Sequence, residues 1–123
     1  MNAYEKIKNK EFCSEIEELN EGINDLSHAE KSLTTLHQVA GTLFEFLEDV
    51  ESRNLPQTMR KQLTSLSDNT VEVMSGLEEF FDLFSQKQTP NMTVPKAMKS
   101  VSNLHLMLNS FSVFAVEIER EGY

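Results

Sequence analysis

Apolar residues recur along most of this chain at intervals of three and four positions, the spacing of one face of an α-helix. The alternation at every second position that indicates strands is not the pattern here. Glycine and proline are scarce, and the helix-breaking residues gather near 20–27, 53–56 and 88–95. The pattern therefore predicts an all-α protein with four helices, near residues 3–22, 27–53, 56–87 and 95–121.

The apolar stripes of the three longer predicted helices match when each helix folds back on the one before it. Leu43 and Leu47 of the second helix then face Leu66 and Leu63 of the third. The fourth helix carries a stripe of seven residues: Ala97, Val101, Leu104, Leu108, Phe111, Ala115 and Ile118. This stripe matches the third helix in the same way. We predict that residues 1–123 form one domain, an antiparallel up-down-up-down four-helix bundle.

The first predicted helix has a weaker stripe and a less certain path. It either folds back on the second helix or continues into it, and the turn-like residues 20–27 favour the fold-back. Ser27 and Glu30 have the capping-box spacing, which places the start of the second helix near Ser27. Gly41 and Gly76 lie inside predicted helices, where either a close neighbour or simple tolerance explains them.

Charge is unevenly placed along the chain. The formal net charge is −9 at pH 7, and residues 15–51 carry ten acids against one base, Lys31. Direct nucleic-acid binding needs a basic surface, so the sequence argues against it. A solvated outer helix face explains the acids most simply. The alternative is a docking surface for a basic partner, with Glu45, Glu48 and Asp49 as its candidate residues.

Features of targeting are also informative. The first residues lack the apolar core of a signal peptide, and no uncharged run is free of polar residues over the length of a membrane span. The lone Cys13 has no partner for an internal disulfide, which suits a reducing compartment. We therefore predict a cytoplasmic protein that does not contact a membrane.

His37 is the strongest candidate for chemistry. The segment from His37 to Gly41, His-Gln-Val-Ala-Gly, resembles the His-x-x-Lys-Gly pattern of four-helix phosphotransfer domains. That resemblance implies a phosphate-accepting histidine on a helix face. Ala40 stands where the pattern has lysine, and Phe44 occupies the place of a smaller residue. We predict instead a histidine at the edge of the core, with no catalytic residue in the chain.

The sequence also lacks the residue patterns of metal, cofactor and phosphate-binding sites. Carboxylate-bridged metal centres in bundles use paired Glu-x-x-His motifs, and the only acid-x-x-His element here is Asp25 to His28 at a helix start. No glycine-rich phosphate loop and no zinc-binding spacing of cysteine and histidine is present. We predict no metal, no cofactor and no enzymatic activity.

The fourth helix is apolar nearly all round, so it needs cover on more than one side. Leu106, Met107, Val113 and Phe114 lie outside its stripe and are the predicted partner-binding residues. We predict a homodimer through this face, and a protein–protein interaction module that binds and regulates or inhibits another protein. Two alternatives stay open: phosphotransfer through His37, and an acidic, nucleic-acid-mimicking inhibitor of a basic protein.

Overall fold

The computed structural model of the chain describes residues 2–123, and these residues are all-helical apart from their connections. Five α-helices and one short 3-10 helix follow one another along the chain: α1 (Ala3–Lys8), α2 (Cys13–Asn24), η1 (Leu26–His28), α3 (Ala29–Glu51), α4 (Gln57–Ser85) and α5 (Val94–Glu121). The all-α prediction is confirmed. The three longer helices begin and end within two residues of their predicted limits.

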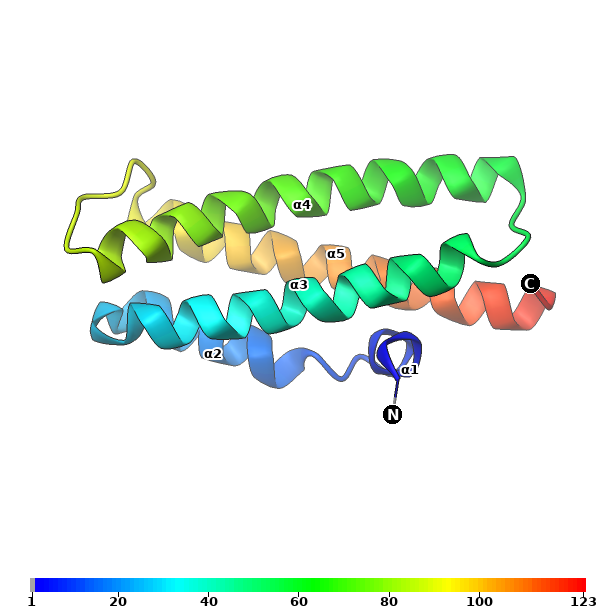
Figure 1. Cartoon of the computed structure of the whole chain (residues 1–123), viewed down its shortest axis with the longest axis horizontal. Coiled ribbons are helices and arrows are strands. Elements are labelled where there is room, and N and C mark those ends of the chain that lie inside the picture. The colour runs from blue at the N-terminus through cyan, green and yellow to red at the C-terminus, as the bar shows by residue number, and fades with distance from the viewer. Residues whose placement is uncertain (1) are drawn as a thin grey trace.

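The long helices α3, α4 and α5 are rods that reverse direction from one to the next (Figure 1). α3 lies against α4, and α4 lies against α5. α2 returns along α3, and both α1 and α2 contact α3 and α5. Within residues 2–123, the backbone of α4 makes no close contact with α1 or α2. Its close backbone contacts with other α-helices are therefore those with α3 and α5, and it also contacts η1.

The predicted helix 3–22 is wrong, because this segment forms two helices. Lys10 adopts a left-handed backbone conformation with φ 57°. The amides of Lys10 and Glu11 donate to the carbonyls of Ile7 and Lys6 at 3.1 and 2.8 Å, the bonding pattern of a Schellman helix end. α1 is seen nearly end-on in Figure 1, so it lies across the long axis of the molecule. Glycine usually occupies a left-handed position at a helix end. Because lysine occupies it here, nothing in the sequence indicates that the helix ends.

The connection between α2 and α3 has the predicted length but lies two residues later in the chain, over residues 25–28. α2 continues to Asn24, so Gly22 lies inside a helix. A side chain at Gly22 would overlap Ser32 Oγ and lie 3.1 Å from Ser32 Cβ, which shows how closely α2 approaches α3. The predicted capping box is also wrong. Asp25 caps η1, with its Oδ1 accepting from the Ser27 amide and hydroxyl at 3.3 and 2.6 Å, and α3 begins after His28 without a side-chain cap.

The buried residues of α5 are those that the sequence predicted, whereas the buried face of α3 is rotated relative to the predicted one. All seven stripe residues of α5 are completely buried. On α3, Leu47 was predicted to face the next helix across the seam and is only half-buried, as are Leu33 and Ala40 at equivalent positions of the helix. Val39 and Phe46 are buried in their place, because α1 and α2 cover this side of α3. The ring of Phe46 stacks on Tyr4 of α1 with centroids 5.6 Å apart.

α5 is long and apolar enough to cross a membrane by length and composition alone. Core helices meet the same criteria, and the stripe of α5 is enclosed by α1, α2 and α4. The apolar residues of this stripe are thus buried inside the protein. The absence of a membrane span stays a prediction.

Candidate protein-binding surfaces

His37 lies on the outer surface of α3, with its side chain 60% exposed. Its Nε2 is 3.5 Å from Oε2 of Glu78 on α4. The sequence placed His37 at the edge of the core, and the structure places it further out. A carboxylate beside the ring nitrogen repels an approaching phosphoryl group, which is also negatively charged. This environment is the opposite of one that holds a phosphate.

Metal-binding chemistry finds no support among the side chains that are described. Over residues 2–123, histidine, cysteine and acidic side chains form no group of three or more that could hold a metal ion. Asp25 and His28 do approach each other, with Oδ2 and Nε2 3.6 Å apart, but both are well exposed. The hydroxyl and amide of Ser27 bond to Asp25 and lower the pKa of its carboxyl group. The Asp25 carboxylate therefore stabilises the turn between α2 and α3 through these hydrogen bonds.

The four residues of α5 that the sequence predicted to bind a partner differ in their exposure to solvent. Leu106 and Val113 are 64% and 62% exposed, and Val116, which the sequence analysis did not name as a partner-binding residue, is 51% exposed. Met107 and Phe114 are half-buried, and Phe114 packs against the core. Leu106, Val113 and Val116 are exposed in the second half of α5, and we call these three residues the α5 outer face. Met98, which is 41% exposed, lies nearer the start of the helix.

The three acidic candidates on α3 also differ from one another. Glu45 and Glu48 are exposed and point to solvent. Asp49 is half-buried and accepts a hydrogen bond from Arg53 Nε at 2.9 Å. The guanidinium of Arg53 lies over the ring of Tyr4, 4.3 Å from its centroid. Asp49 thus belongs to an internal contact, while Glu45 and Glu48 remain available to a partner.

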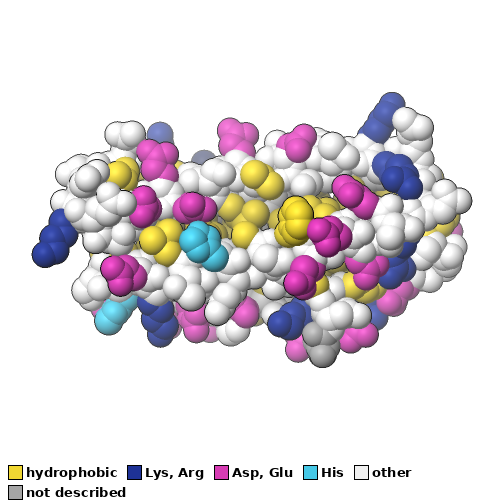
Figure 2. All heavy atoms as spheres, viewed as in Figure 1, with side chains coloured by type: hydrophobic (Ala, Val, Ile, Leu, Met, Phe, Trp, Pro, Cys, Tyr) yellow, Lys and Arg dark blue, Asp and Glu magenta, His cyan; other side chains and the backbone are white. Residues whose placement is uncertain are grey.

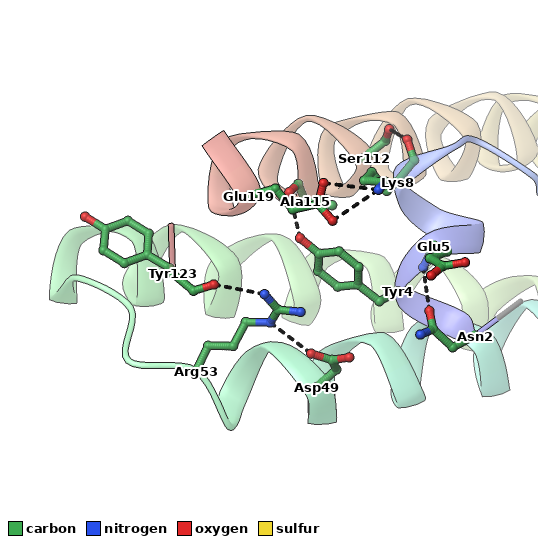
Figure 3. A network of polar contacts seen from close by, with 10 residues as sticks. All are labelled: Asn2, Tyr4, Glu5, Lys8, Asp49, Arg53, Ser112, Ala115, Glu119 and Tyr123. Carbon is green, nitrogen blue, oxygen red and sulfur yellow. Dashed lines mark hydrogen bonds and ion pairs between the residues drawn. The ribbon is translucent and has the colours of Figure 1, made fainter. Parts of the chain in front are cut away.

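That internal contact ties the ends of several helices together (Figure 3). Arg53 also donates to the carbonyl of Tyr123 at 2.9 Å. The hydroxyl of Tyr4 donates to the carbonyl of Ala115 at 2.7 Å, and Lys8 Nζ lies 3.1 Å from both carboxylate oxygens of Glu119. Burial raises the pKa of the Tyr4 hydroxyl, with the nearby Arg53 acting in the opposite direction. This group fastens α1 to α5 and is structural.

A groove between α3 and α4 is the surface that the sequence did not reveal. A cavity of about 430 Å³ opens near the connection between the helices, and one of about 240 Å³ opens near their middle. Leu47 lines both cavities. Phe44 and Val71 line the second cavity and are 64% and 51% exposed. Figure 2 shows a line of hydrophobic side chains between α3 and α4, with acidic side chains beside it.

One signal in the sequence points to this groove. His37, Phe44 and Glu51 are spaced by seven residues, and so are Thr64, Val71 and Glu78. Residues seven apart share one face of a helix. These two rows lie beside the predicted stripes and form the two edges of the groove. Phe44 was noticed only as a neighbour of His37, because its exposure depends on how closely α3 and α4 approach.

Comparison with known proteins supplies no relative. No family model matches the chain, and no curated protein or solved structure matches it. The geometry of the two apolar surfaces is therefore the basis for a functional proposal.

Proposed function

We propose that this chain is a non-enzymatic protein–protein interaction module that binds and regulates or inhibits a partner protein. The fold that we propose is an up-down-up-down four-helix bundle, in which α1 and α2 together occupy the first position. The contacts of α2 with α3 and α5, and of α4 with the same two helices, support a bundle with four corners. We propose a cytoplasmic location, consistent with the single exposed cysteine, Cys13.

One observation carries the proposal: large apolar side chains are open to solvent on two surfaces. Leu106 and Val113 are exposed on α5, and Phe44 and Val71 are exposed along α3 and α4. Contiguous exposed apolar groups on a small protein usually mark an interface. These side chains are not part of the core, which is formed by buried apolar residues on the inner faces of the same helices.

The α5 outer face is the proposed homodimer surface. α5 has equal numbers of acidic and basic residues, so two copies of this face meet without net repulsion. Light scattering at tens of micromolar tests the idea with the native chain and the Leu106→Glu, Val113→Lys double variant. We expect a native dimer and a monomeric variant. A native monomer contradicts the dimer.

Capture from a native lysate tests the broader proposal. The native chain, immobilised, is expected to retain a protein that is absent from a bait in which Phe44, Val71, Leu106 and Val113 are all replaced by serine. All four side chains are more than half exposed, so this bait keeps the same core. If native and substituted baits retain the same proteins, the proposal fails.

The two alternatives give different results. Phosphotransfer requires transfer of phosphate from a phosphorylated receiver domain to His37, and His37→Gln abolishes it. The exposure of His37 favours this function, while the adjacent Glu78 opposes it. An acidic mimic binds its partner through charge alone, so its complex dissociates steeply as salt rises and is indifferent to Phe44→Ser.

A further inference from the structure

The groove between α3 and α4 has an apolar base. Leu43 and Met74 lie at the base of the middle cavity, Val50 and Leu63 at the base of the larger one, and Leu47 joins the two. The bases are buried, whereas the edges at Phe44 and Val71 stand open. A ligand in this groove therefore buries apolar surface without any rearrangement of the core.

The charge around the groove is strongly negative. α3 and α4 together carry ten acidic and three basic residues, which is −7 of the total −9. Glu51 and Asp68 line the larger cavity, and Glu78 lines the middle one. Arg60 also lines the larger cavity, but its guanidinium donates to the carbonyls of Leu55 and Arg53. Carboxylates outnumber cationic groups along the two cavities, so we expect the occupant of the groove to be basic.

This charge excludes a second copy of the same groove as the occupant. Two such grooves placed face to face bring Glu51, Asp68 and Glu78 of both copies together, which is unfavourable in a partly desolvated interface. The neutral α5 of a second copy supplies no cationic complement either. The partner is thus a different chain, with cationic side chains at its edges and apolar ones at its centre.

The shape of the groove indicates a helical occupant. It extends from Leu36 to Glu51 along α3. At 1.5 Å per residue this is about 23 Å, the length of a helix of about four turns. A helix with apolar residues at every third or fourth position packs its ridge into the groove between two other helices.

We propose that the groove between α3 and α4 binds a basic amphipathic helix of a partner protein. This proposal rests on the interaction function proposed above and specifies one surface and one class of partner. The apolar face of the helix covers Phe44, Leu47 and Val71. Its lysine or arginine side chains reach the carboxylates of Glu51, Asp68 and Glu78.

The test uses a fluorescent peptide of about 18 leucine and lysine residues, with leucines at helical spacing. Its binding to the full chain is followed by fluorescence anisotropy. A matched peptide carries glutamate in place of every lysine. We expect saturable, one-to-one binding of the basic peptide and at least about tenfold weaker binding of the acidic one. Equal binding of both peptides, or no binding of the basic one, overturns the proposal.

Paired variants locate the binding surface. Phe44→Ser with Val71→Ser removes apolar groups from the groove, and Leu106→Ser with Val116→Ser removes groups of the same exposure, 64% and 51%, from α5. We expect the groove pair to weaken binding at least about tenfold and the α5 pair less than about threefold. Equal losses overturn the proposal. Circular dichroism of both pairs establishes that the fold is retained.

A second matched set separates local charge from net charge. Glu51→Gln, Asp68→Asn and Glu78→Gln neutralise the edges of the groove, and Glu11→Gln, Glu17→Gln and Glu21→Gln remove the same charge from exposed positions in and next to α2. The groove set is expected to weaken binding about tenfold at low salt, and the α2 set far less. Equal effects show attraction by net charge alone, which contradicts a groove.

Failure of this inference is distinguishable from failure of the interaction function. A partner that is captured by the native chain and retained by the Phe44→Ser, Val71→Ser variant contradicts the groove but leaves the interaction function in place. When native and fully substituted baits capture the same proteins, the function itself fails, whatever the peptide does.

Discussion

The interfaces on either side of α4 look alike in sequence and differ in structure. Against α5, the stripe residues of that helix, from Ala97 to Ile118, have no exposed surface. Against α3, Leu47 is only half-buried, Phe44 and Val71 are exposed, and two cavities remain open. α5 is enclosed by α1, α2 and α4, whereas the seam between α3 and α4 has no third helix over it (Figure 1). Matching apolar stripes thus identify which helices lie side by side, but they do not determine how tightly the two helices pack.

The largest expected effect comes from deleting equivalent leucines on the two sides. Leu108→Ala in the closed interface is expected to lower the free energy of unfolding by about 3 to 5 kcal/mol, because it leaves a cavity in a filled core. Leu47→Ala only enlarges an existing opening, and we expect a loss of about 1 kcal/mol. Urea unfolding followed by circular dichroism measures both. Equal losses would mean that the groove is closed in solution.

Two glycines provide the next comparison. Gly22→Ala is expected to cost about 1 to 3 kcal/mol, because the new methyl group meets Ser32 across the contact of α2 with α3. Gly41 has no atom within 4 Å of an added Cβ, so Gly41→Ala is expected to stabilise α3 by up to about 1 kcal/mol. Thermal unfolding gives both values. Addition of Ser32→Ala should recover part of the Gly22→Ala loss, and the absence of any recovery would argue against this contact.

Tyr4 tests the fastening of α1 to α5. Tyr4→Phe removes the hydrogen bond to the Ala115 carbonyl and is expected to cost about 1 kcal/mol. Burial raises the pKa of Tyr4 above 10.0 in the folded protein. The unfolded chain therefore loses this proton first, and the contribution of Tyr4 to stability falls as pH rises above about 10.

Urea unfolding of the native protein and of Tyr4→Phe between pH 8 and about 11 checks this sign, because the two proteins differ only in the hydroxyl of Tyr4. The native protein should lose stability more steeply than Tyr4→Phe. Parallel curves would show that Tyr4 is exposed in solution.

The smallest effect is expected at the edges of the groove. Phe44→Ser and Val71→Ser replace side chains that are already more than half exposed. We expect the free energy of unfolding to change by less than about 0.5 kcal/mol at each position. A loss of about 2 kcal/mol at either one, measured by urea unfolding, would identify a core residue and remove the basis for a binding surface.

The sequence predicted the long helices well because each carries a regular stripe and ends at proline or polar turn residues. It failed between α1 and α2, where Lys10 supplies the left-handed conformation without glycine. It also misplaced the buried face of α3 by about one residue. Val39 and Phe46 are apolar on the side of Leu36 and Leu43 away from α4, and only the position of α1 and α2 decides that this side is covered.

The candidate surfaces were predicted in part. Exposure of Leu106 and Val113 follows from their place opposite the α5 stripe, and the structure places them there. The groove was missed because it depends on the spacing of α3 and α4, which side-chain volumes on both helices determine together. Asp49 was grouped with Glu45 and Glu48 by charge, since its bond to Arg53 is not visible in the spacing alone.

Chemical-shift mapping of the ¹⁵N-labelled chain with the leucine–lysine peptide tests the central claim most directly, because it reports where a basic helix binds. The account predicts that the largest shifts fall on residues 36–51 of α3 and 63–78 of α4, with little change on α5. Shifts concentrated on residues 102–117 of α5, or spread over all acidic positions, would contradict it.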